Sequence, residues 1–285
     1  MKPIVTVVTV CFNSVNTIEK TIKSVLEQPC EDYEYLIIDG LSSDGTLDVI
    51  KTYEQKFKGR LKYISEKDKG WYDAMNKGVA LSEGSFVNFL NSDDYFETGA
   101  LKKVVDYIKA NHIDENSIVY GDSTNVYQNS KGETLCLRIH APEKIDSQCP
   151  GLSEGMCGIR HQSMFTGKGV FQKVGLLDLN FRLHADWDFF IKSLKMDIPY
   201  YYLNENLTYY SMYGVSTRPN CRERHMVRKD NGLYKGIDIY YWKDKCGLKT
   251  IVRRLLGARR WNDFLFWHHE RKNRSKTKRQ VSGER

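Results

Sequence analysis

Four short apolar runs alternate with three helix-like stretches in the first 95 residues, and this alternation limits the possible folds more than any other feature. Each run is rich in β-branched or aromatic residues, and the stretches between them repeat apolar residues at helical spacing. The runs cover residues 4–12, 35–39, 61–65 and 86–90. This repeated strand–helix order predicts an α/β fold with a doubly wound, mostly parallel sheet.

The pattern changes after residue 95. Residues 102–111 and 189–194 have helical spacing, whereas residues 118–127 and 200–203 are strand-like. Residues 141–160 are rich in Gly, Pro, Ser and Cys and have no periodicity, which predicts a loop.

The composition fits one large domain, or a domain with an appendage. The chain has 285 residues, 41% of them hydrophobic, and no run of about 18 apolar residues that could span a membrane. The N-terminal residues lead directly into strand-like sequence without the apolar core of a signal peptide. Seven scattered cysteines form no CxxC pair and no zinc-binding spacing, which predicts free thiols in a reducing compartment. Together these features predict a cytoplasmic protein.

Positive charge is concentrated at the C-terminal end. Residues 249–285 carry 12 of the 43 lysines and arginines against three acidic residues, a net charge of +9, whereas the whole chain carries +7. Four aromatic residues lie among these cations: Trp261, Phe264, Phe266 and Trp267. Basic and aromatic residues together are typical of segments that lie on membranes. The apolar spacing past Gly257 does not keep to one helical face, so a solvated tail, partly disordered from Lys272 onward, is the alternative. A nucleic-acid partner is not expected, because no nucleic-acid-binding module accompanies the tail.

Polar side chains follow each of the four predicted strands. Thr9, Cys11 and Asn13 lie at the end of the first strand, and acidic residues follow the other three: Asp39, Asp68, Asp93 and Asp94. Ligands of open α/β sheets bind where the carboxyl ends of the strands meet. Two adjacent carboxylates at such a place repel one another unless a cation or a polar ligand offsets the charge. The alternative for Asp93 and Asp94 is an acidic turn that caps the following helix.

Two common phosphate-binding loops are absent from the sequence. No GxGxxG follows the first strand, which argues against a dinucleotide site, and there is no Walker A sequence. A divalent cation on Asp93 and Asp94 is then the expected way to neutralise the phosphates of a nucleotide.

Several longer stretches resemble one known family. They are VTVVTVCFN (residues 5–13), IIDGLSSDGT (37–46), SEKDKGWYDAMNKG (65–78), FLNSDD (89–94) and LHADWDFF (183–190). In order and spacing they resemble family 2 glycosyltransferases, which have the GT-A fold, from residue 4 to about 217. RHQSMF (160–165) and YGVST (213–217) are similar to bacterial members that build cell-surface polysaccharides.

The resemblance implies a role for each matching residue on the donor side. Thr9, Cys11 and Asn13 would line the pocket of the nucleotide base, and Asp39 would accept a hydrogen bond from the base, most naturally from uracil N3–H. Asp93 and Asp94 would contact the ribose and hold Mn²⁺ or Mg²⁺ on the diphosphate. The chain departs from many relatives at Asn91, where they have a first Asp. The other residues expected beside the nucleotide or sugar are Asp68, Asp73, Asn76 and Lys77.

The resemblance also implies a catalytic base and an acceptor side. Asp186 would take the proton of the acceptor hydroxyl, although Ala185 replaces the acidic residue that precedes the base in the family. His161, Gln162 and Trp187 would lie on the acceptor side. For arbitrary residues the alternatives are a helix cap for Asp186, a structural histidine for His161 and a core position for Trp187.

These expectations combine into one hypothesis. The chain would be an inverting, metal-dependent glycosyltransferase that moves a sugar from a UDP-sugar to a lipid-linked saccharide acceptor. The product would belong to a capsule, an O-antigen or an exopolysaccharide. Residues 1–95 would bind the nucleotide-sugar, residues 96–217 would supply the acceptor side and the base, and residues 218–285 would form the basic extension. The rivals are a nucleotidylyltransferase, whose glycine-rich loop is absent here, and a catalytically silent binding protein, which Asn91 and Ala185 leave open.

Overall fold

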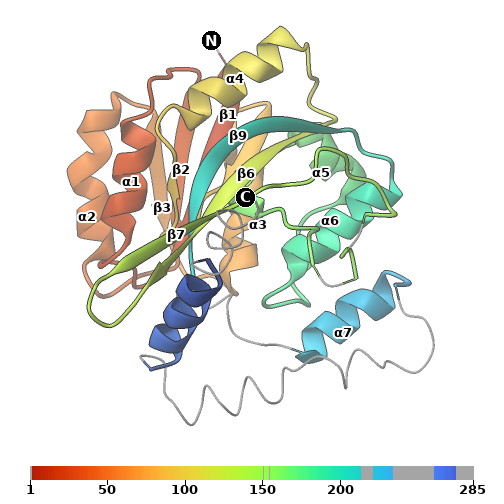
Figure 1. Cartoon of the computed structure of the whole chain (residues 1–285). Coiled ribbons are helices and arrows are strands. Elements are labelled where there is room, and N and C mark those ends of the chain that lie inside the picture. The colour runs from red at the N-terminus through yellow and green to blue at the C-terminus, as the bar shows by residue number, and fades with distance from the viewer. Residues whose placement is uncertain (1, 150, 154, 213–220, 234–259, 274–285) are drawn as a thin grey trace, which may run out of the picture.

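The predicted alternation of strands and helices forms one parallel half of a sheet. The computed structural model describes residues 2–149, 151–153, 155–212, 221–233 and 260–273 (Figure 1). In this half the strand order is β3-β2-β1-β4, and all neighbours are parallel. The strands are β1 (Val5–Cys11), β2 (Tyr33–Asp39), β3 (Leu61–Ser65) and β4 (Phe86–Phe89), and the helices between them are α1 (Ile18–Leu26), α2 (Thr46–Tyr53) and α3 (Trp71–Leu81).

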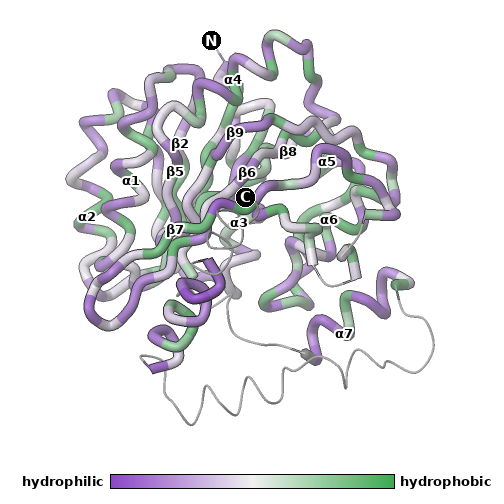
Figure 2. The backbone as a smooth tube through the Cα atoms, in the orientation of Figure 1, coloured by the Kyte–Doolittle hydropathy of each residue, from purple (hydrophilic) through white to green (hydrophobic). Residues whose placement is uncertain are grey.

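Helices cover both faces of the sheet, which confirms the doubly wound α/β fold. Successive side chains of a strand point to opposite faces. Val5 and Val7 of β1 accordingly pack with α1, α2 and α4 (Ala100–Ala110), whereas Val8 and Val10 pack with α3, α5 (Lys168–Val174) and α6 (Ala185–Lys195). The helices carry hydrophilic residues beside their hydrophobic ones (Figure 2), as expected for helices with one buried face.

The second half of the sheet is mixed. β8 (Met164–Gly167) joins the halves, antiparallel to both β4 and β6 (Ile118–Gln128). β6 pairs in parallel with β9 (Tyr200–Ser211), and its last residues pair with β7 (Thr134–Ile139) as a hairpin. β5 (Tyr95–Phe96) pairs with β9. Sequence patterns missed β5, β7, β8 and α5, which are short or half exposed, and gave only the start of β9.

Three predictions for the later part of the chain have different outcomes. Residues 141–160 contain no helix or strand where they are described, as expected for a loop. The proposed boundary at residue 217 and the motif YGVST fall at 213–220, outside the described residues. Residues 260–273 form a helix, although the apolar spacing did not indicate one. A further helix, α7 (Cys221–Asp230), precedes it.

Gly78 allows α3 to lie close against β1. A Cβ atom at this position would overlap Cγ1 of Val8, so we expect Gly78→Val to lower the free energy of unfolding by about 1–3 kcal/mol, the usual cost of overpacking. Ala80→Val is the matched control, because Ala80 is exposed on the same helix and loses only helix propensity, about 0.7 kcal/mol at most. Equal losses for both variants in urea unfolding would contradict this close packing.

Candidate functional site

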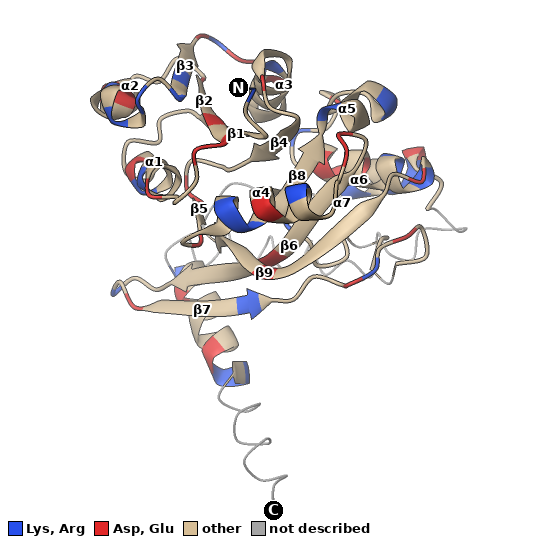
Figure 3. Ribbon diagram, turned by 90° about the horizontal axis from the view of Figure 1, so that it is seen from above, with Lys and Arg blue, Asp and Glu red and all other residues tan. Residues whose placement is uncertain are grey.

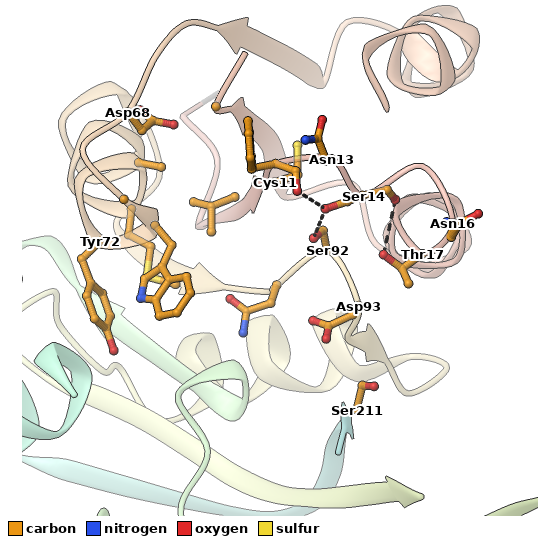
Figure 4. Close-up of a pocket in the computed structure, with 18 of the residues that line it drawn as sticks. Cys11, Asn13, Ser14, Asn16, Thr17, Asp68, Tyr72, Ser92, Asp93 and Ser211 are labelled. Carbon is orange, nitrogen blue, oxygen red and sulfur yellow. Dashed lines mark hydrogen bonds between the residues drawn. The ribbon is translucent and has the colours of Figure 1, made fainter. Parts of the chain in front are cut away.

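A cavity of about 940 Å³ opens where β1 and β4 end, the edge at which the sequence predicts a ligand (Figure 4). Its walls come from the end of β1, the start of α1, the first turns of α3, the loop after β4 and the β6–β7 hairpin. His161, Asp186 and Ser211 complete the lining from the second half of the sheet. A volume of this order is typical of sites for small molecules and cofactors.

Asp186 lies in the first turn of α6, with its carboxylate held by two side chains. Oη of Tyr72 donates to Oδ1 at 3.0 Å, and Nδ1 of His161 lies 2.8 Å from Oδ2. Because an ionised carboxylate only accepts, Nδ1 of His161 carries the proton. Burial disfavours the charge on Asp186, but the hydrogen bond and the charge of His161 outweigh it and lower the pKa of this carboxyl. Asp186 is therefore ionised at neutral pH and faces the cavity.

His161 connects this carboxylate to the loop after β4. Its Nε2 lies 3.3 Å from Nδ2 of Asn91, and the same amide nitrogen donates to Oδ2 of Asp94 at 3.2 Å. An amide NH₂ has two protons, so Asn91 can donate to Asp94 and, when the His161 ring is neutral, to Nε2 of His161 as well. An Asp at position 91 has no proton to give to either.

Asp93 and Asp94 have different surroundings, although they are adjacent in sequence. Asp93 lines the cavity (Figure 4). Burial raises its pKa, and no ion pair involves it among the described residues. The Asp94 side chain points away: only 1% of the residue is exposed, and its carboxylate accepts hydrogen bonds from the backbone of Ser211 at 2.8 Å and from Gln162 at 2.6 Å. Burial, followed by the charge of Asp93, raises the pKa of Asp94 well above its ordinary value.

Asp94, which the resemblance implies as a metal ligand, has its carboxylate bonded within the protein in this structure. Its carboxylate ties the loop after β4 to β9 and to the short 3₁₀ turn His161–Ser163, and it is not part of the cavity wall. Asp93 is the one of the pair that faces the cavity. The described residues contain no group of three or more His, Cys, Asp and Glu side chains placed to hold a metal. Since Mg²⁺ is commonly bound by one or two carboxylates together with substrate phosphates, Asp93 fits a cation that is shared with a diphosphate.

The residues expected around the nucleotide separate into two groups. Cys11, Asn13, Asp68 and Asn91 line the cavity. The others lie outside the lining and have protein partners. These are Thr9, bonded to Tyr35; Asp39, bonded to Ser42 and Ser65; Asp73, bonded to the backbone of Lys69; Asn76, bonded to the backbone of Leu177; and Lys77, paired with Asp68 and Glu66.

The burial of Asp39 bears on base recognition. The Ser42 and Ser65 hydroxyls donate to its carboxylate at 2.5 and 2.6 Å, and the residue is fully buried. In this structure the Asp39 carboxylate is therefore occupied by serine hydroxyls and is not exposed to a base.

Two residues expected on the acceptor side belong to the interior. Trp187 is 3% exposed, and its Nε1–H donates to the carbonyl oxygen of Leu152. Gln162 is fully buried against Asp94. Trp187 therefore packs in the hydrophobic core, and Gln162 binds the carboxylate of Asp94. Of the three residues expected on the acceptor side, only His161 faces the cavity.

Sequence patterns missed several lining residues. Trp71 and Tyr72 open α3, where aromatic side chains are easily taken for core residues. On the other wall, Nζ of Lys20 lies 3.4 Å from the centre of the Tyr95 ring, and Tyr95 stacks on Tyr209. The two-residue strand β5 gave no periodic signal for this wall.

The sequence of this chain is similar to those of known glycosyltransferases. The sequence model described as Glycosyl transferase family 2 matches residues 6–165. A Mycobacterium tuberculosis PGL/p-HBAD biosynthesis glycosyltransferase is 30% identical over 195 residues, 67% of this chain and 69% of that protein. The putative teichuronic acid biosynthesis glycosyltransferase TuaG of Bacillus subtilis is 29% identical over 222 residues, 77% of this chain and 83% of that protein.

Solved structures agree on the fold. S. aureus TarS 1–349 in complex with UDP-GlcNAc superposes with a TM-score of 0.60 at 15% identity, over 87% of this chain and 71% of that one. The chain spans 43% of the longer TarS chain. No helix in the described residues has the length and apolar character needed to cross a bilayer. Since the family model covers more than half of the sequence and the solved relatives share its GT-A architecture, this chain belongs to glycosyl transferase family 2.

Proposed function

We propose that this chain is an inverting glycosyltransferase that moves a sugar from a UDP-sugar to a saccharide acceptor. One observation carries the proposal: Asp186 and Asp93, from the two halves of the sheet, present their carboxylates to the same cavity. Transfer with inversion needs a base for the acceptor hydroxyl and stabilisation of the charge on the leaving diphosphate. The two carboxylates match these two requirements.

Asp186 is the base of this reaction. The acceptor oxygen attacks C1 of the sugar, its proton passes to Asp186, and the bond between C1 and the diphosphate oxygen breaks on the opposite side. The new glycosidic bond therefore has the inverted configuration. Each oxygen of a carboxylate has two acceptor sites, so Tyr72 and His161 can keep Asp186 in place while the acceptor hydroxyl approaches it.

Asp93 is the residue that would hold the divalent cation. Its carboxylate is partly desolvated and has no ion pair among the described residues, which favours a bound cation. When present, Mn²⁺ or Mg²⁺ would neutralise negative charge on the diphosphate. Asp94 acts indirectly, since its hydrogen bonds to Ser211, Gln162 and Asn91 keep the loop that bears Asp93 in position.

The relatives support the substrate class. TarS was solved with UDP-GlcNAc, the mycobacterial relative is named for PGL/p-HBAD biosynthesis, and the Bacillus relative is a putative teichuronic acid biosynthesis glycosyltransferase. We infer a role in bacterial cell-envelope glycoconjugate biosynthesis, such as that of a capsule, O-antigen or exopolysaccharide, with a lipid-linked saccharide as acceptor. Family membership removes the support for a nucleotidylyltransferase.

A donor screen tests the proposal. Purified protein is incubated with UDP-, GDP- and CMP-sugars and a panel of saccharide acceptors, with Mn²⁺ or with a chelator, and the released nucleotide is measured. We expect release of UDP that depends on both acceptor and cation. Equal turnover with Mn²⁺ and with the chelator would contradict the role of Asp93 as a cation ligand. The absence of turnover with every donor would favour a silent binding protein.

The hydrogen bond from Tyr72 predicts a shift in the pH profile. Activity requires ionised Asp186 and is lost as the pH falls through its pKa, which His161 and Tyr72 lower. Tyr72→Phe removes one donor, so the acidic limb of kcat/KM should move to higher pH. Activity should fall about 10- to 100-fold, since a hydrogen bond to a charged group contributes about 1.5–3 kcal/mol and each 1.36 kcal/mol is a factor of about ten. Tyr107→Phe is the control, because its hydroxyl donates to the backbone of Tyr202. An unmoved limb in Tyr72→Phe would contradict this role.

A further inference from the structure

The outer face of the helix formed by residues 260–273 exposes two large aromatic rings among cations. Phe264 and Trp267 are 49% and 50% exposed. Arg260 and Arg271 are also exposed. Residues 260, 264, 267 and 271 are three or four positions apart, so they share one face of the helix.

Other residues of this helix are buried or contact the β6–β7 hairpin. Trp261 and Phe266 are buried, and the ring of His269 lies 4.5 Å from that of Tyr127 in β6. Asp263 accepts a hydrogen bond from the backbone of Ser130 in the β6–β7 turn at 2.6 Å. The exposed aromatic rings therefore sit on an anchored helix, which presents them in a fixed direction.

The helix lies next to the wall of the cavity. Tyr127 contacts the helix, whereas its neighbours Val126 and Gln128 line the cavity. Adjacent residues of a strand point to opposite faces, so among the described residues the β6–β7 hairpin lies between this helix and the cavity. In Figures 1 and 3 the helix lies on the outer side of this hairpin, away from α1 and α2.

We propose that this outer face, defined by Arg260, Phe264, Trp267 and Arg271, docks on the surface of an anionic phospholipid bilayer. Aromatic rings enter the headgroup region while cations bind anionic lipids. The net charge of +9 in residues 249–285 has the matching sign. The convex face of a single helix suits a flat interface, whereas single-stranded nucleic acids are bound in grooves. Docking here would hold the β6–β7 side of the cavity near the membrane, which suits the lipid-linked acceptor of the proposed function.

Vesicle sedimentation of the full chain tests this surface without any sugar donor, so its outcome is independent of the transfer reaction. We expect binding to phosphatidylcholine vesicles that contain phosphatidylglycerol, and little binding to phosphatidylcholine alone. Binding should weaken between about 0.1 M and about 1 M salt, as the Debye length falls from about 10 Å to about 3 Å.

Matched variants identify the residues responsible. Phe264→Ser with Trp267→Ser should reduce binding about tenfold or more, because both rings lose apolar contact. Arg260→Glu with Arg271→Glu should do the same, since each cation near an anionic surface contributes about fivefold. Leu176→Ser with Leu179→Ser is the control, as these side chains are 52% and 46% exposed but lie between α5 and α6. Circular dichroism checks that each variant is folded.

Three outcomes would overturn the proposal. The first is equal sedimentation with neutral and anionic vesicles, or with neither. The second is binding that survives both variants of the outer face. The third is a labelled oligonucleotide that binds through the same four residues while vesicles do not, which would assign the face to a nucleic acid.

Discussion

Asp186→Asn is expected to lower sugar transfer about 10²–10⁴-fold, the usual contribution of a general base. The amide has nearly the same shape as the carboxylate but cannot take the proton of the acceptor hydroxyl. Equilibrium binding of UDP should stay close to that of the wild type, because the expected nucleotide contacts come from β1 and the loop after β4. The measurement is kcat for transfer, with UDP binding determined by calorimetry on the same preparation.

Asp188→Asn is the matched control for this variant. Asp188 lies on the same helix and is buried, but its carboxylate binds Asn231 and Lys192, both at 2.6 Å, and does not face the cavity. This variant should lose stability and keep most of its kcat. Transfer by Asp186→Asn at the wild-type rate would exclude Asp186 as the base. If His161→Gln lost far more activity than Asp186→Asn, the base would be His161.

Asp93→Asn and Asp94→Asn should fail in different ways. Asp93→Asn should reduce transfer about 10²–10³-fold and abolish the response to Mn²⁺, by analogy with the loss of one group that stabilises transition-state charge. Its unfolding free energy should hardly change, since Asp93 has no ion pair among the described residues. In Asp94→Asn, the new amide NH₂ would replace a carboxylate oxygen that now accepts a hydrogen bond from Ser211 or from Gln162, so two donors would face each other. Each buried donor left unsatisfied costs about 1–3 kcal/mol, so urea unfolding should show a clear loss of stability.

Comparing the two variants shows which of the two carboxylates binds the cation. A Mn²⁺ titration of activity in Asp94→Asn, at a temperature where it is folded, should give a midpoint near that of the wild type. The reverse pattern, in which Asp94→Asn alone loses the cation response, would restore the assignment made from sequence and contradict the structural role given to Asp94.

The parallel half of the fold was predictable because each of its elements carries its own pattern. β1 and β2 are buried runs, and α3 (Trp71–Leu81) is one of the helix-like stretches between the strand-like runs. The second half depends on pairing between distant segments. β5 and β8 have two and four residues, too few for a periodic signal. The helix at 260–273 was missed because its aromatic residues divide between a buried face and an exposed face.

Only part of the cavity lining was predictable from the sequence, and its geometry was not. The sequence motifs singled out Asp186, His161, Asn91 and Asp93, and all four line the same cavity in the structure. Nothing in the string NSDD distinguishes the carboxylate that faces the cavity from the one that binds β9, because that difference depends on Ser211, more than one hundred residues away. The burial of Trp187 likewise follows from its contact with Leu152. The individual roles of the site residues stay predictions.

The configuration of the product at the transferred sugar tests the central claim most directly. Wild-type protein is given an α-linked UDP-hexose accepted in the donor screen, with its acceptor, and the new anomeric proton is followed by NMR. In-line displacement with Asp186 as the base predicts a β-glycoside, formed together with one equivalent of UDP. An α-glycoside would contradict the proposed mechanism.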